Sequence, residues 1–210
     1  MTEMKPDQVS YIVIHTAAIK DPNLALQTGV DEIRDWHLNR KPPFLDIGYH
    51  YVIVHPDGRY AAPGKVGLIQ HGRDRRLCGA HCRGMNCRSI GICVVGDGDT
   101  NDFLPDQYEE LCRICSFMID AYPGITVENI IGHHEINDLV KVGLAPASCT
   151  TTKTCPGKCV DMNVVRGRIM QFRNRRIAKI VADIRSADTD TVEPAIVEHM
   201  DNGPDGWLLY

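Results

Sequence analysis

Two short segments in the second half of the chain place a histidine and a cysteine where they suit a metal site. The stretch 132–157 begins with Gly-His-His-Glu and ends with Lys-Thr-Cys-Pro-Gly. We hypothesise that His133 and Cys155 are two ligands of a catalytic zinc, and that His15, far upstream, is the third. Zinc prefers imidazole and thiolate ligands, and three protein ligands leave the fourth tetrahedral position for water. The hypothesis admits only folds that bring these distant segments together.

The upstream histidine follows a short apolar run at residues 11–14. This run is rich in β-branched side chains, which predicts a buried strand. Functional side chains of α/β sheets gather beyond strand ends, so His15 is a candidate site residue. For His15 taken alone, the alternative is a histidine at the edge of the core with a local hydrogen bond.

The spacing of apolar residues predicts the other elements. Helices are predicted at 30–39 and 105–122, strands at 46–54, 59–60 and 89–95, and a short element at 125–131. Thr28 is the expected cap of the first helix, and Pro105 suits the first turn of the second. His37 is expected to be structural, packing beside Trp36. Residues 137–152 show no periodicity.

Length and charge narrow the class of protein. One domain with an appendage is expected for 210 residues. A net charge of -4 argues against general nucleic-acid binding, and no segment approaches the ~20 apolar residues of a membrane span. The polar N-terminal segment lacks the basic and apolar parts of a secretory signal, which predicts synthesis in the cytoplasm.

The chain holds nine cysteines, an odd number. Most are expected to be reduced thiols, and one metal-ligand cysteine with several buried free ones fits better than a disulfide framework. Cys112 and Cys115 lie on the apolar stripe of a predicted helix and are expected in the core. A structural zinc site is a weaker alternative, with Cys78, His81, Cys82 and Cys87 as its ligands. The spacing of these four residues matches no common zinc ribbon.

The last fifty residues differ from the rest in charge. We predict a domain at 1–160 and an extension at 161–210, formed by a basic helix at 163–185 and an acidic flexible segment. The helix carries seven basic residues and one acid, and residues 186–210 carry six acids and no Lys or Arg. The helix is expected either to pack on the domain or to contact an anionic surface, a membrane or a wall polymer.

Seven short motifs together resemble the type 2 N-acetylmuramoyl-L-alanine amidases, a family that includes phage lysozyme-amidases and the peptidoglycan recognition proteins. The motifs lie at 12–16, 33–37, 46–51, 79–81, 86–91, 132–135 and 153–157. Each is weak alone, but their joint order and spacing are specific. The small phage enzymes are most similar, because of the His-His-Glu and Lys-x-Cys-Pro sequences.

The resemblance implies an α/β fold with a central mixed β-sheet flanked by helices and one zinc ion in a surface groove. It maps the zinc ligands onto His15, His133 and Cys155. The segment between the last two looks longer than in compact phage members, so Cys149 and Cys159 are rival ligands. Cys155 is preferred because it alone lies in a Lys-x-Cys-Pro context.

The resemblance also maps catalytic roles onto Tyr49 and Lys153. Tyr49 is expected to orient the attacking water or to move its proton, and Lys153 to place an ammonium near the developing oxyanion. His81 maps to the groove wall, where we expect it to contact substrate. His134 is the rival of His133 as a zinc ligand. Adjacent residues of an extended strand point to opposite faces, so only one of the two is expected to face the metal. Glu135 is either a partner of a ligand histidine or a surface carboxylate.

The implied reaction is hydrolysis of the amide between N-acetylmuramic acid and L-alanine in peptidoglycan. Zinc would polarise the carbonyl and lower the pKa of water. The expected protein is a monomeric phage endolysin or an intracellular wall-remodelling enzyme, whose partner is peptidoglycan and no nucleic acid. Because no signal segment is seen, it would reach the wall through a holin or another external route.

Three alternatives to this enzyme stay open. The first is a peptidoglycan-binding module of the same fold without activity, in which the cysteine ligand is expected to be replaced. The second is a polymerase-binding regulator, since a phage lysozyme of this family also binds RNA polymerase. The third is a structural zinc protein, which a zinc content well above one per chain would favour.

Overall fold

The computed structural model describes residues 1–61 and 67–186. The chain divides into two compact units, Met1–Phe172 and Arg173–Tyr210. The sheet and the candidate site belong to the first unit. Within the described ranges, no helix is both long and apolar enough to cross a membrane.

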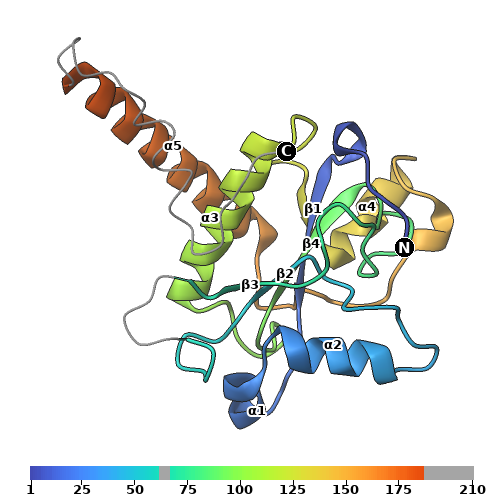
Figure 1. Cartoon of the computed structure of the whole chain (residues 1–210). Coiled ribbons are helices and arrows are strands. Elements are labelled where there is room, and N and C mark those ends of the chain that lie inside the picture. The colour runs from blue at the N-terminus through green and yellow to red at the C-terminus, as the bar shows by residue number, and fades with distance from the viewer. Residues whose placement is uncertain (62–66, 187–210) are drawn as a thin grey trace. The chain divides into compact units, whose positions relative to one another are not determined.

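Five strands form one mixed sheet in the order β3-β2-β4-β1-β5 (Figure 1). They are β1 (Tyr11–Thr16), β2 (Tyr51–Ile53), β3 (Ile69–His71), β4 (Ser89–Val94) and β5 (Ile130–Gly132). All neighbouring pairs are parallel except β2 with β3. Every residue of β1 and β4 is buried. Parallel strands covered on both faces have continuous apolar sequences, which explains why these two segments lack alternation.

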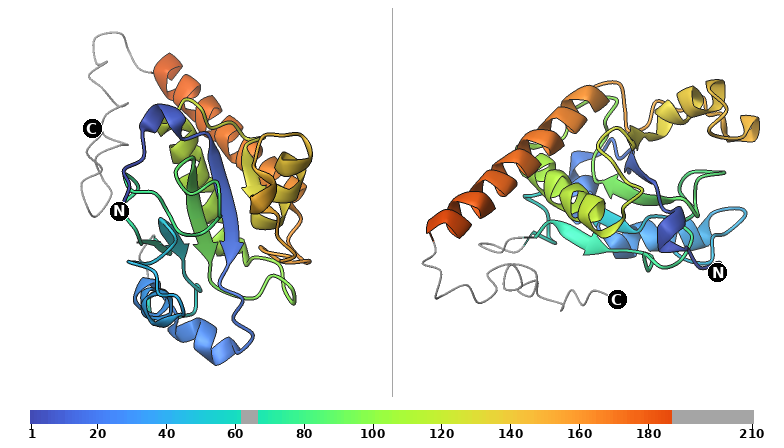
Figure 2. Two further views of the ribbon diagram at one scale, coloured as in Figure 1. Left: turned by 90° about the vertical axis from the view of Figure 1, so that its right-hand side faces the viewer. Right: turned by 90° about the horizontal axis from the view of Figure 1, so that it is seen from above.

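Helices flank this sheet (Figure 2). The helices of the described residues are α1 (Pro22–Gln27), α2 (Val30–Asn39), α3 (Pro105–Ala121), α4 (Ile136–Lys141) and α5 (Met162–Ser186), with 3-10 turns η1 (Pro6–Gln8), η2 (His133–Glu135) and η3 (Ala147–Cys149). Of α5, only the part up to Phe172 belongs to the unit that contains the sheet. The architecture confirms the predicted mixed sheet flanked by helices. The helices predicted at 30–39 and 105–122 are α2 and α3, and Cys112 and Cys115 are buried in the core as expected.

Two local predictions about the α2 and β2 region are wrong. Thr28 does not cap α2, because its hydroxyl donates to the Leu24 carbonyl, and the Glu32 carboxylate instead accepts from the Gly29 amide at 2.8 Å. The return strand predicted at 59–60 does not form, because the Arg59 amide donates to the end of α1. The antiparallel partner of β2 is β3, and β2 is shorter than the strand predicted at 46–54.

The cysteines include one disulfide, between Cys78 and Cys87, whose Cα atoms lie 4.4 Å apart. Cα atoms at this separation suit a disulfide, so these two residues do not form the alternative structural zinc site. The other seven cysteines are free thiols, five of them buried. The expectation that most cysteines are reduced is therefore confirmed, while the disulfide itself was not predicted.

The last helix, α5, matches the basic helix predicted at 163–185. Its first turns bury Met162, Val165 and Ile169 in the first unit. The domain boundary at residue 160 and the contact with an anionic surface stay predictions. From residue 187 onward, the predicted acidic segment lies outside the described residues.

Candidate active site

The parallel pairing of β1 and β5 brings the two proposed histidine ligands together. Ile14 pairs with Gly132, so the residues that follow them, His15 and His133, lie side by side at the carboxyl ends of neighbouring strands. Their ring centroids are 4.7 Å apart. Cys155 completes the group, since its Sγ is 3.6 Å from Nδ1 of His15. The fold therefore unites three segments that are far apart in sequence.

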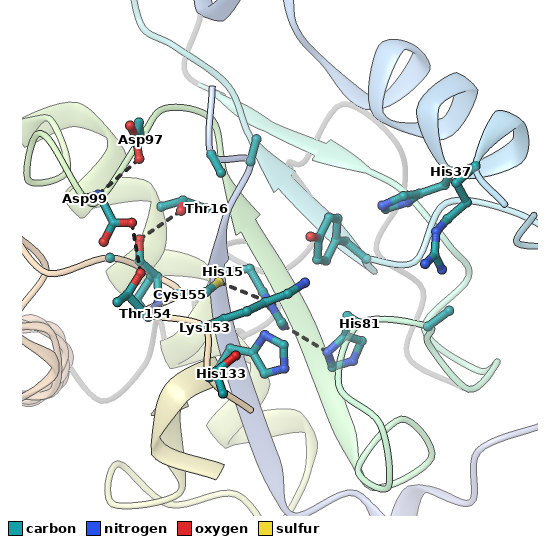
Figure 3. Close-up of a pocket in the computed structure, with 18 of the residues that line it drawn as sticks. His15, Thr16, His37, His81, Asp97, Asp99, His133, Lys153, Thr154 and Cys155 are labelled. Carbon is teal, nitrogen blue, oxygen red and sulfur yellow. Dashed lines mark hydrogen bonds between the residues drawn. The ribbon is translucent and has the colours of Figure 1, made fainter. Parts of the chain in front are cut away.

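The ligand atoms of His15, His133 and Cys155 all lie within 4.8 Å of one another. Across residues 1–61 and 67–186, no other trio of His, Cys, Asp or Glu side chains is placed to hold a metal ion in this way. In Figure 3 the three side chains converge on one space, over which Lys153 extends. The arrangement can hold one metal ion.

Burial sets the protonation of these groups. It is the main cause that lowers the pKa of His15 well below its usual range, followed by the nearby His81 and His133. The pKa of His133 falls to about 4, first through burial and then through the charge of Lys153. Burial raises the pKa of the Cys155 thiol to about 11. Both imidazoles are therefore neutral and ready to bind a cation at pH 7, whereas the thiol must first lose a proton.

The rival ligands lie outside this group. Nδ1 of His134 faces the Cys155 carbonyl at 3.0 Å, and the His134 amide donates to the same oxygen at 2.8 Å. His133 begins a 3-10 turn rather than continuing an extended strand. Cys149 is buried in an apolar cluster, and Cys159 contacts the Asp99 carbonyl. His134 thus supports the cysteine loop rather than joining the metal group.

The loop after β4 holds the loop that carries Cys155. The Asp99 carboxylate accepts from the Thr154 hydroxyl at 2.9 Å and from the Lys158 amide at 3.0 Å. The Cys159 amide donates to the Gly98 carbonyl at 2.9 Å. Asp99 was not among the predicted site residues, although an acid just beyond a buried strand was the signal available.

Tyr49 lies beside His15. Its ring centroid is 5.1 Å from that of His15. Burial raises the pKa of the Tyr49 hydroxyl well above 10, so it stays a hydrogen-bond donor at neutral pH. Lys153 is exposed and lines the same groove. The Tyr49 hydroxyl is hydrogen-bonded to the Cys93 side chain on β4, and both predicted helpers line the groove that holds the metal group.

His81 is buried against His15 rather than exposed along an open wall. It is 9% exposed, and its Nδ1 is 3.2 Å from Nε2 of His15. A Cβ atom at Gly79 or Gly91 would come within 2.4–2.5 Å of its ring, so both glycines make room for it. His81 lines the groove, but its ring nitrogen is directed at His15 and fixes which nitrogen of that ring faces Cys155. The predicted contact with substrate stays a prediction.

A groove of about 560 Å³ extends from the Cys155 loop to the end of α2. At that end it is lined by His37, Arg40 and Phe44. The His37 ring accepts a hydrogen bond from the Gly48 amide at 2.9 Å and lies 5.3 Å from the Tyr49 ring. His37 is therefore part of the groove, beyond the structural role that was predicted beside Trp36.

Comparisons with known proteins agree with this architecture. A profile of the family described as N-acetylmuramoyl-L-alanine amidase matches residues 5–158. The endolysin of Escherichia phage T7 is 31% identical over 143 residues, which cover 66% of this chain and 78% of that protein. Endolysin of Klebsiella phage KP32 is 29% identical over 150 residues, 69% of this chain and 82% of the other.

Solved structures share the fold at low sequence identity. The N-acetylmuramoyl-L-alanine amidase LysC from Clostridium intestinale superposes with a TM-score of 0.56 at 19% identity, covering 81% of this chain and 93% of that chain. Drosophila PGRP-LB superposes with a TM-score of 0.52 at 18% identity, covering 74% and 78%. The family profile spans most of the chain and a phage relative matches two thirds of it, so this chain belongs to the N-acetylmuramoyl-L-alanine amidase family.

Proposed function

We propose that this chain is a zinc-dependent amidase that hydrolyses the bond between N-acetylmuramic acid and L-alanine in peptidoglycan. The observation that carries the proposal is the group formed by His15, His133 and Cys155, open to a groove that also holds Tyr49 and Lys153. Membership of the family and the endolysin relatives support it. As in the relatives that are named endolysins, we infer a role in opening the cell wall after release from the cytoplasm.

The donor set fits zinc. Two neutral imidazoles and one thiolate are typical of catalytic zinc sites that leave a position open. Carboxylate ligands, which Mg²⁺ and Ca²⁺ prefer, are absent from the group. When bound, zinc supplies a Lewis acid for the scissile carbonyl and lowers the pKa of water.

The side chains around this group supply the remaining chemistry. Lys153 places a positive charge beside the scissile carbonyl, where negative charge develops as water adds to it. Tyr49 supplies a hydroxyl that stays protonated and can orient the water or the carbonyl. His81 holds His15 through the ring nitrogen that faces away from Cys155. The chain therefore provides charge stabilisation, orientation and ligand positioning.

A binding module without activity is the main alternative. It would need the groove but not the thiolate ligand. Cys155 is present, is directed at His15, and is held there by hydrogen bonds to its backbone from His134. This arrangement favours hydrolysis over binding alone.

The test is the analysis of products released from purified peptidoglycan sacculi. We expect the wild type to release stem peptides with a free L-alanine amino terminus, and Cys155→Ser to release none. Cys159→Ser is the matched control, because that thiol is exposed and outside the metal group. Tight binding to sacculi without released peptides would refute the enzyme and support the binding module.

A further inference from the structure

An arginine of α5 reaches back to the turn that carries His133. The guanidinium of Arg166 donates to both carboxylate oxygens of Glu135, each at 3.0 Å. It also donates to the Ile130 carbonyl at 3.0 Å and to the Asn163 side chain at 2.9 Å. Arg166 thus joins three places: the first residue of β5, the turn η2 and its own helix.

The Glu135 carboxylate also caps the turn η2. Its Oε2 accepts a hydrogen bond from the Gly132 amide at 2.8 Å. Gly132 and Glu135 bracket His133, so this bond fixes the backbone from which the imidazole projects. Its hydrogen-bond partners in the described residues are Gly132 and Arg166 rather than a ligand histidine, and its side chain is only 20% exposed, so Glu135 matches neither of its two expected roles. The carboxylate caps the turn, and the arginine holds the carboxylate.

This ion pair differs from the surface pairs of the same region. The side chains of Arg166 and Glu135 are each 20% exposed, whereas those of Lys141 and Asp138 on α4 are 74% and 68% exposed. Exposed pairs contribute little because solvent screens them. A two-pronged contact between guanidinium and carboxylate is stronger and fixes direction as well as distance. The Arg166 pair is therefore suited to hold a backbone turn in place.

We propose that Arg166 is a positioning residue for the metal site, acting through Glu135 on the turn that presents His133. The inference rests on the proposed function for the identity of the metal. It assigns part of the site to a helix that begins after residue 158, where the family match ends. The first turns of α5 would then be a component of the amidase site rather than an appendage.

The experiment compares zinc affinity among purified full-length variants, by competition with a chelator. We expect Arg166→Ala and Glu135→Gln each to weaken zinc binding about tenfold, as loss of a residue supporting a metal ligand commonly does. The double variant should bind zinc no more weakly than the single variant with the lower affinity. Both changes remove the same Arg166–Glu135 contact, so their effects should not add. Arg168→Ala is the matched control: it lies on the same helix, over the Tyr108 ring, away from the turn.

A second variant keeps the test valid if Arg166→Ala does not fold. Arg166→Lys keeps the charge but cannot form the two-pronged contact with the Glu135 carboxylate, so its zinc affinity should lie between those of wild type and Arg166→Ala. Thermal unfolding of the metal-free proteins shows whether each variant folds. A merely structural role would lower the melting temperature and leave zinc affinity unchanged.

Equal zinc affinity in wild type, Arg166→Ala and Arg168→Ala would overturn the inference while leaving the proposed function intact. A wild type that binds no zinc would contradict the proposed function and this inference together. Should Arg166→Ala fail to fold, Glu135→Gln and Arg166→Lys carry the same comparison.

Discussion

The three proposed ligands differ in what they must do before they can hold a metal ion. His15 and His133 are neutral at pH 7 because burial lowers the pKa of both imidazoles. Cys155 is a thiol at that pH, because burial raises its pKa to about 11. Metal binding must therefore expel one proton, and it must come from sulfur.

Zinc affinity should consequently rise with pH. Below the pKa of the thiol, release of one proton predicts about a tenfold gain in affinity for each pH unit. Titration calorimetry at pH 6 in buffers of different ionisation enthalpy counts the protons released. We expect about one for the wild type and about none for Cys155→Ser. A wild type that binds zinc without releasing a proton would exclude Cys155 as a ligand.

The two helpers should be separable from metal binding. Lys153→Ala removes the charge that stabilises the developing oxyanion, a loss that commonly lowers turnover by about 10²–10³-fold. Tyr49→Phe removes only the hydroxyl. Both variants should keep about one zinc per chain by elemental analysis while losing most of their turnover on sacculi. Wild-type turnover in both would contradict these roles.

Among the elements, the two loops that meet beside Cys155 are packed too tightly for side chains. A Cβ atom on Gly98 would lie 1.9 Å from the Pro156 carbonyl oxygen. Gly157 adopts a φ of 132°, and a Cβ atom on it would lie 1.9 Å from the carbonyl carbon of Gly98. Only glycine suits that position. The close approach allows the Thr154 hydroxyl and the Lys158 amide to donate to the Asp99 carboxylate, which holds the cysteine loop.

Gly98→Ala should therefore force the two loops apart. We expect a loss of stability of about 1–3 kcal/mol, typical of overpacking, together with weaker zinc binding. Gly167→Ala is the matched control, because a Cβ there meets open space within α5. That change should stabilise the protein by about 0.5–1 kcal/mol. Chemical denaturation of both variants measures these changes, and a neutral Gly98→Ala would contradict the tight contact.

Elements with strong periodicity could be predicted, and short ones could not. Continuous apolar runs identify β1 and β4, and stripes at helical spacing identify α2, α3 and α5. β3 is a three-residue edge strand with no fully buried position, so its sequence carries no burial pattern. α4 spans under two turns and buries only Ile136. Both elements owe their conformation to tertiary contacts.

Within the candidate site, too, some residues could be predicted from the sequence and others could not. His15, His133 and Cys155 were predictable as a set because each lies in a motif that resembles the amidase family. Asp99 and Arg166 were not singled out, because they act through hydrogen bonds to segments distant in sequence. The only sequence signal for Asp99 was its place just beyond a buried strand, and nothing in the sequence separates Arg166 from the other basic residues of its helix.

For the molecule as a whole, buried histidines make stability depend on pH. His50 accepts a hydrogen bond from the Gly91 amide and donates to the Leu77 carbonyl. Its pKa is lowered to about 4, mainly by burial. The unfolded chain takes up this proton near pH 6.5, whereas the folded chain does so only near pH 4. Stability is therefore complete above pH 6.5 and is lost as the pH falls towards 4.

Acid should thus destabilise the metal-free wild type through His50 by an amount on the order of 3 kcal/mol. Urea unfolding at pH 7.5, 6 and 5 compares the wild type with His50→Gln. The variant should be less stable at pH 7.5, and its deficit should shrink as the pH falls. Parallel stability curves would show that His50 titrates normally in the folded protein.

The most direct test of the whole account is the zinc K-edge X-ray absorption spectrum of the purified protein. We predict one zinc per chain with one sulfur neighbour at about 2.3 Å and nitrogen or oxygen neighbours at about 2.0–2.1 Å, the sulfur being lost in Cys155→Ser. A zinc with no sulfur neighbour, or with several, would contradict the proposed centre of His15, His133 and Cys155.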